Sequence, residues 1–166
     1  MKRWVRIQEV KQPSKKRSMN SVFDKSVREE LIKRINSLRD NHKAQWGKMN
    51  AFQMAKHCTH CDDMFLGKVK IKRAFIGRLI GKMILKKSLK DTSPFGRNSP
   101  TAPVLITTND NGDIESQKKE WLKRIEQYEN YRDINFVHPF FGPMTKEQIG
   151  AFVYKHADHH LRQFGV

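Results

Sequence analysis

The spacing of apolar residues along the chain predicts a protein built from helices. Apolar residues three and four positions apart share one helix face, and this period recurs from residue 27 to the C-terminal end. Strand patterns are weak, and "APVLITT" (102–108) is the one stretch with strand character. The fold class that we predict is therefore all-α, with four core helices and one extra amphipathic helix. We expect these helices, in chain order, to begin near Asp24 or Ser26 and to cover 51–66, 71–87, 114–131 and 146 to near the end.

Capping residues support several of these boundaries. Asn50 precedes the second helix, where its side chain can accept a hydrogen bond from the first turn, and Gly67 follows as a natural C-terminal cap. Thr145 and Gln148 have the spacing of a capping box at the start of the last helix. Two long connections remain, a Pro-rich loop over 91–113 and an aromatic loop over 133–145.

The extra helix has an apolar side and many lysines. We expect its apolar side to cover the core of the helical domain and its charges to face solvent. The residues of the apolar side are Ile71, Phe75, Leu79, Ile80, Met83 and Ile84.

The length of 166 residues fits one domain with a hydrophobic core. We expect residues 1–20 to be a basic, irregular N-terminal segment and residues 21–166 to be the helical domain. No apolar run reaches the roughly 18–20 residues of a membrane-spanning helix, and the N-terminus lacks the apolar stretch of a secretory signal. A cytoplasmic location is the resulting expectation, and the two cysteines exclude a disulfide scaffold.

A net charge of +16 favours acidic partners, and it is concentrated in 11–18 and 68–90. The positive charge could serve to bind nucleic acid, an anionic membrane or acidic metabolites, or it could simply be exposed to solvent. The charge alone leaves these alternatives open.

Helical angles place histidines on the inner faces of two helices. At about 100° per residue, the inward residues of the second helix are Met54, His57, Cys58, Cys61, Met64 and Phe65. Those of the last helix are Ile149, Phe152, Val153, His156, His160 and Gln163. The residues that we expect to point away are Lys56, Thr59, Asp62 and Asp63 on the second helix and Tyr154, Lys155, Asp158 and Arg162 on the last, with His60 and His159 toward the flanks.

One inward histidine is usually a hydrogen-bonded core residue, and three on converging faces leave two interpretations open: a shared metal site or a hydrogen-bonded core. His156 and His160 lie one turn apart, so both imidazoles reach toward one point, a recurrent spacing of metal ligands. His57 is the third candidate ligand.

The stretch "AKHCTHCDD" (55–63) admits three interpretations. A zinc knuckle needs a second ligand pair, and a thioredoxin-like CxxC needs a helix N-terminus that lowers the thiol pKa. Cys58 and Cys61 lie in mid-helix with no second pair, so we favour the third, in which they line a pocket beside His57. Cys61, one turn beyond His57, stays a candidate for approach to the metal. His138 and Gln163 are further candidates for pocket lining, although a structural role in its loop suits His138 better.

Three segments carry a resemblance to a known family. They are "WGKMNAFQMAKHC" (46–58), "GRLIGKMILKKSLKDTSPFGRNSPTAP" (77–103) and "HPFFGPMTKEQIGAFVYKHADHHLRQFG" (138–165), the last being the most specific. They resemble the bacterial family called domain of unknown function 1569, within the DinB-like superfamily of four-helix-bundle proteins. The resemblance covers roughly residues 17–166. This sequence departs from the family pattern in two respects, the cysteines beside His57 and the strong positive charge.

The resemblance implies a metal triad at His57, His156 and His160, holding a divalent ion, most often zinc or nickel, with open coordination positions. It implies relatives that are thiol-dependent S-transferases, isomerases or hydrolases using low-molecular-weight thiols. We therefore expect a divalent-metal-binding protein with a small-molecule substrate, acting as a thiol-dependent transferase or a hydrolase. The alternative is a non-enzymatic protein whose basic amphipathic helix binds nucleic acid or an anionic membrane. Homodimerisation is left open.

Overall fold

The computed structural model describes residues 19–99, 105, 107, 111–132 and 135–166, and over these residues it confirms the all-α prediction. Its helices are α1 (Lys25–Ser37), α2 (Ala51–Phe65), α3 (Phe75–Ser88), α4 (Ile114–Gln127) and α5 (Lys146–Gln163). A short 3-10 helix, η2 (Tyr128–Asn130), follows α4. The predicted N-terminal segment lies outside the described residues up to residue 18, as does most of the strand-like stretch 102–108.

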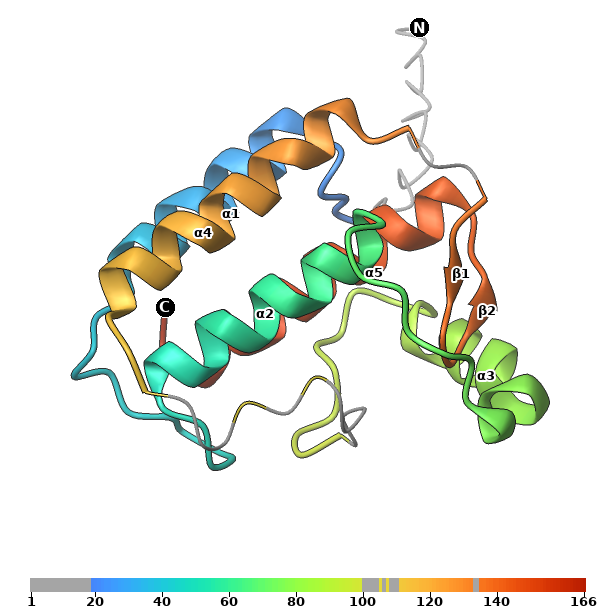
Figure 1. Cartoon of the computed structure of the whole chain (residues 1–166), viewed down its shortest axis with the longest axis horizontal. Helices are drawn as coiled ribbons and strands as arrows, with labels where there is room; N and C mark the ends of the chain where they lie inside the picture. Colours follow the sequence, from blue (N-terminus) through green and yellow to red (C-terminus); the bar gives the residue numbers. More distant parts are fainter. Residues whose placement is uncertain (1–18, 100–104, 106, 108–110, 133–134) are drawn as a thin grey trace, which may run out of the picture.

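Four of the helices, α1, α2, α4 and α5, pack against one another. α1 packs against α4 and α5, and α2 packs against the same two helices. Figure 1 shows α1 beside α4, α2 in front of α5, and α3 away from this group, next to the hairpin of β1 (Val137–His138) and β2 (Gly142–Pro143). A continuous core fills the space between the four packed helices, with Leu31, Met54, Trp121, Ile125 and Leu161 fully buried within it.

The aromatic loop contains a hairpin that the sequence did not predict. β1 (Val137–His138) pairs antiparallel with β2 (Gly142–Pro143), and His138 lies opposite Gly142. Strands of two residues are too short to show an alternating apolar pattern, so the sequence predicted only an aromatic loop here.

The caps predicted for α2 and α5 are confirmed, whereas α1 begins after Asp24 without a side-chain cap hydrogen bond. Asn50 and Gln53 form a reciprocal capping box at the start of α2, and Thr145 and Gln148 form another at the start of α5. Gly67 follows the end of α2 with φ of +71°, the left-handed conformation that favours glycine. Each N-terminal cap stabilises its helix by about 1 kcal/mol, so both helices that carry the candidate histidines begin at residues that the sequence specifies.

The outward placement predicted for Thr59 and Asp62 is wrong. Both residues are buried, because α4 packs on the side of α2 that carries them. Asp62 accepts hydrogen bonds from Trp121 Nε1 at 3.0 Å and from the Tyr128 hydroxyl at 2.8 Å. Helical period marks the most apolar face of α2, but a second helix packs on its polar side through these hydrogen bonds.

Replacing Asp62 with asparagine is expected to flatten the pH dependence of stability. Burial raises the pKa of Asp62 to about 7, although the hydrogen bonds from Tyr128 and Trp121 oppose the shift. In the unfolded chain the carboxyl releases its proton near its ordinary value of 3.8. Folding therefore takes up a proton between these pH values, and the free energy of unfolding falls as pH rises, by up to about 1.4 kcal/mol per pH unit.

Urea denaturation of both proteins across that pH range measures the effect. The asparagine keeps one acceptor oxygen and gains an N–H group that can donate a hydrogen bond to the Tyr128 hydroxyl oxygen, so the variant should fold. Its free energy of unfolding should lose most of this dependence on pH. Equal slopes in the wild type and in Asp62→Asn would contradict the assignment.

The outward placement predicted for Lys155 and Asp158 on α5 is also wrong. Asp158 is buried and forms ion pairs with Arg34 Nη1 of α1 and Arg162 Nε, both at 2.8 Å. The Lys155 ammonium donates to the carbonyl oxygens of Ser88 at 2.6 Å and Asp91 at 3.0 Å. These carbonyls lie at and just beyond the end of α3, where a cation is favourable because of the helix dipole. Lys155 and Asp158 therefore contact α3 and α1 rather than water, whereas Arg162 on the same side of α5 stays exposed.

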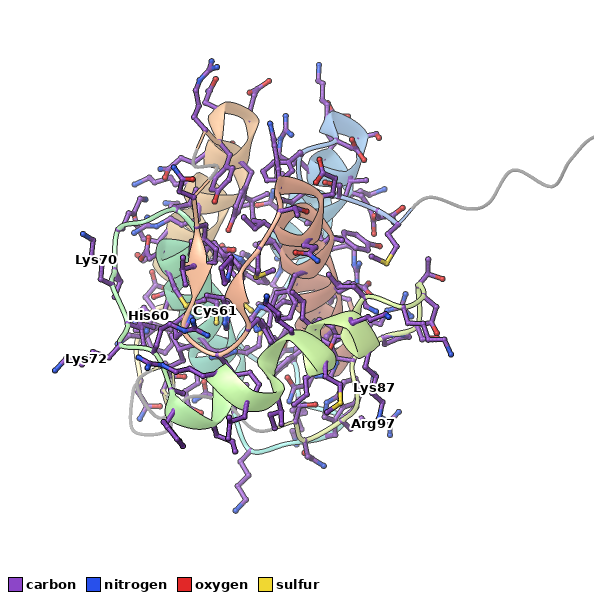
Figure 2. The ribbon with its side chains drawn as sticks, turned by 90° about the vertical axis from the view of Figure 1, so that its right-hand side faces the viewer. His60, Cys61, Lys70, Lys72, Lys87 and Arg97 are labelled. Atoms are coloured by element: carbon purple, nitrogen blue, oxygen red, sulfur yellow. The ribbon has the colours of Figure 1, made fainter. Side chains whose placement is uncertain are left out.

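The apolar side predicted for the extra helix covers the core only in part: Ile71 and Ile84 pack against the core, but three other residues of that side are exposed. The side chains of Phe75, Leu79 and Met83 are 75%, 69% and 65% exposed. α3 instead faces the protein with Gly77, Gly81 and Leu85. Figure 2 shows α3 lying across this face of the molecule, with Lys72 near its beginning and Lys87 near its end.

Within the described part of the chain, no helix combines the length and the apolar character needed to cross a membrane.

Candidate metal centre

The structure brings His57, His156 and His160 together. His57 lies on α2, and the other two lie one turn apart on α5, where α2 and α5 pack. One ligand nitrogen from each imidazole lies within 4.8 Å of the other two. His57 and His160 are buried and His156 is half-buried. These are the three histidines that helical spacing selected.

The separation of the nitrogens suits a metal ion. The Nε2 atoms of His57 and His156 are 3.1 Å apart. Two nitrogens bound to one ion at 2.0–2.1 Å, with an angle of about 90–110° between them, are about 2.9–3.4 Å apart. Two imidazoles at this distance otherwise need one of the nitrogens to donate a proton to the other.

Two hydrogen bonds orient the imidazoles. His57 Nδ1 lies 2.9 Å from the carbonyl oxygen of Leu105, which can only accept, so Nδ1 carries the proton and Nε2 has a free lone pair. His160 Nδ1 lies 2.9 Å from Gln163 Oε1, while Gln163 Nε2 donates to the Trp46 carbonyl at 2.6 Å. The Trp46 carbonyl fixes the amide of Gln163, so His160 also donates through Nδ1 and presents Nε2. Metal-binding histidines commonly have such a partner on the second nitrogen.

Gln163, which the sequence nominated for pocket lining, is thus a buried residue that orients His160. Its close contact with the 45–47 connection depends on Gly47, which has a φ of +82°. A Cβ atom at Gly47 would lie 2.6 Å from Gln163 Nε2. The sequence contains no periodic signal for this contact, because the connection and the helix end are far apart along the chain.

All three imidazoles are held in the neutral form, which is the form that binds metal. Burial lowers the pKa of His156 well below its ordinary value of 6.5, and the neighbouring His160 and His57 lower it further. Burial lowers the pKa of His160 to about 3. Burial also lowers the pKa of His57, and the hydrogen bond to Leu105 opposes this shift. The three imidazoles can therefore bind a divalent ion without first releasing protons.

The two cysteines differ in their position relative to the histidines. Cys61 Sγ lies 3.8 Å from His57 Nε2, whereas Cys58 Sγ lies 3.8 Å from the sulfur of Met54 in the core. Both thiols are buried, and burial raises the pKa of each above its ordinary value. The thiolate is the metal-binding form of cysteine, so these thiols are not ready-made ligands. Cys61 is the cysteine that adjoins the histidine cluster.

His138 has a structural role in the hairpin. Its Nδ1 accepts hydrogen bonds from the backbone N–H groups of Phe140 at 3.1 Å and Phe141 at 3.2 Å. Its ring stacks on Phe141, and burial lowers its pKa to about 4. The structure therefore supports the loop-structural alternative for His138.

A cavity of about 400 Å³ lies beside the histidine cluster, and sequence reasoning did not find it. His159 connects the two, since it lines the cavity and its ring centroid is 5.1 Å from that of His160. Arg97 lies over the Trp46 ring at 4.5 Å. The sequence indicates this arrangement through the adjacent pair His159–His160. Neighbouring positions of a helix project about 100° apart, so one imidazole can line the cavity while the other faces the histidine cluster. The lining residues are Gln45, Trp46, Pro94, Phe95, Arg97, His159, Arg162, Gly165 and Val166.

Three inward imidazoles on two packed helices define a helical protein with a candidate metal centre. The sequence matches the family described as "Protein of unknown function (DUF1569)" over residues 17–165, and the chain belongs to this family. The same kind of comparison with curated proteins and with solved structures finds no match.

Proposed function

We propose that this protein is a DinB-like four-helix-bundle metalloprotein in which His57, His156 and His160 bind one divalent ion, zinc or nickel. The observation that carries the proposal is the set of three neutral imidazoles whose ligand nitrogens lie within 4.8 Å of one another. A divalent ion with open positions lowers the pKa of a water or thiol and polarises a carbonyl. We infer a thiol-dependent transferase or hydrolase activity on a small-molecule substrate.

The residues around the histidines fix the site in place. Leu105 and Gln163 hold the Nδ1 protons of His57 and His160, so both rings keep one orientation. Phe152 lies nearly parallel to His156, with ring centroids 6.3 Å apart. The hydrogen bonds to Leu105 and Gln163 orient the rings of His57 and His160, and the burial of these two histidines strengthens electrostatic interactions at the proposed site.

The adjacent cavity is the proposed place for the substrate. Its cationic side chains are Arg97 and Arg162, and Trp46 offers an aromatic surface. Arg162 already pairs with Asp158 at 2.8 Å, so Arg97 is the cation better placed for an acidic group. A small thiol that carries a carboxylate matches this combination of charge and aromatic surface.

Cobalt substitution tests the thiol part of the proposal and the role of the cysteines. We expect cobalt-loaded protein to show little thiolate-to-cobalt charge transfer, because Cys58 and Cys61 are buried thiols. Adding cysteine as an external thiol should generate the band, and Cys58→Ala/Cys61→Ala protein should behave in the same way.

The contrary result would be a strong band in untreated protein that is lost in Cys61→Ala and kept in Cys58→Ala. Cys61 would then be a fourth ligand, and a closed coordination sphere would indicate a structural metal site.

A further inference from the structure

Four of the six large exposed apolar side chains of the described residues lie on α3. Val69 precedes α3, and Val137 lies in the hairpin that contacts it. The other four are on α3 itself, and three of them follow one another at intervals of four residues, which puts them in a row. Contiguous apolar surface of this kind marks an interaction site. The four residues are Phe75, Ile76, Leu79 and Met83.

Glycines hold α3 in the orientation that exposes this row. A Cβ atom at Gly77 would lie 2.3 Å from the Phe140 carbonyl oxygen, and one at Gly81 would lie 2.1 Å from the same atom. Only glycine permits so close an approach to the hairpin backbone. Leu85 is buried on the same side, and Lys155 binds the carbonyl of Ser88 at the end of the helix. The apolar row is thus turned away from the protein by specific contacts.

The segment around the row is strongly basic. Residues 64–90 contain nine lysines and arginines and no acidic residue, against a net charge of +16 for the whole chain. All nine side chains belong to exposed residues. Lys68 pairs with Asp63 at 3.5 Å, and among the described residues none of the other eight forms an ion pair with a carboxylate. Figure 2 shows Lys70 and Lys72 toward one end of α3 and Lys87 and Arg97 toward the other.

We propose that α3 docks this protein onto an anionic lipid bilayer, lying in the plane of the interface. Helices that bind this way present an apolar row to the acyl chains and lysines or arginines to the headgroups, and they do not span the membrane. A second copy of the chain would bring nine further cations to the same face, which opposes self-association. Duplex DNA would satisfy the charges and leave Phe75, Leu79 and Met83 uncovered. An anionic bilayer satisfies both.

Vesicle co-sedimentation of the full chain tests the proposal. We expect binding to phosphatidylcholine vesicles that contain about 30 mol% phosphatidylglycerol, weaker binding as salt rises, and little binding to phosphatidylcholine alone. Phe75→Ser/Leu79→Ser should weaken binding to the anionic vesicles at least about tenfold, since two large apolar side chains no longer insert. Both residues are exposed, so the circular dichroism spectrum and the thermal midpoint should match those of the wild type.

A matched pair of charge reversals separates local from overall charge. Lys82→Glu/Lys86→Glu changes α3, and Lys33→Glu/Lys119→Glu makes the same change in net charge on α1 and α4, which Figure 1 shows on the opposite part of the molecule. Only the first pair should weaken vesicle binding. Equal losses in the two variants would show a nonspecific charge effect and overturn the proposal.

A probe on the row tests insertion directly. Cys58 and Cys61 are buried, so Met83→Cys offers one accessible thiol for an environment-sensitive fluorophore. Its emission should shift to shorter wavelength with anionic vesicles. An unshifted probe would overturn the proposal. So would duplex DNA binding that survives Phe75→Ser/Leu79→Ser without vesicle binding, or a dimer that this variant dissociates. None of these outcomes depends on metal content, so they are independent of the proposed metal site.

Discussion

Replacing His156 with alanine is expected to abolish stoichiometric metal binding. The Nε2 atom of His156 lies 3.1 Å from that of His57, and no other imidazole of the described residues is placed to replace it in the set of three. His57→Ala and His160→Ala should have the same effect, because two imidazoles bind a divalent ion far more weakly than three. The measurement is the zinc and nickel content of protein purified without an affinity tag.

His159→Ala and His60→Ala are the matched controls. His159 is the direct neighbour of His160 and lines the cavity, and His60 is on the same helix as His57, but neither belongs to the set of three nitrogens. Both variants should retain about one metal ion per chain. Loss of metal in His159→Ala with retention in His160→Ala would show that the wrong face of α5 had been assigned.

Replacing Gly81 with alanine is expected to detach α3 from the hairpin. Alanine stabilises an exposed helix by about 1 kcal/mol relative to glycine. At Gly81, however, the Cβ atom would lie 2.1 Å from the Phe140 carbonyl oxygen, and backbone cannot move aside as a flexible side chain can. Overpacking of this kind costs about 1–3 kcal/mol. Alanine should therefore destabilise the packing of α3 if the glycine is packed against the hairpin, and stabilise the helix if the glycine is exposed.

Limited digestion with trypsin measures this local opening, since Arg78 and Lys82 are cleavage sites within α3. Cleavage there should be about tenfold faster in Gly81→Ala, because it follows the population of the opened helix. Ile76→Ala serves as the control on the exposed side of the same helix and should leave the rate near that of the wild type. Slower cleavage in Gly81→Ala would contradict the packing.

The candidate metal site shows how much of a site the helical spacing of residues can predict. Apolar stripes and capping boxes placed α2 and α5, and the four-residue spacing of His156 and His160 fixed their common direction. His57 shared the inward face of α2, so the set of three could be named before the two helices were placed together. Gln163 shows the limit, because its partner is the Trp46 carbonyl in a distant connection.

The sequence by itself determined the helices, their caps and the three inward histidines, because these depend on residues within a few positions of one another. Tertiary structure decided which faces are covered, because burial depends on what packs against each face. Asp62 and Asp158 are polar by sequence and buried because α4 and α1 bring hydrogen-bonding and cationic partners to them. Phe75 and Leu79 are apolar and exposed because Gly77 and Gly81 let the opposite side of α3 approach the Phe140 backbone more closely than any larger residue could.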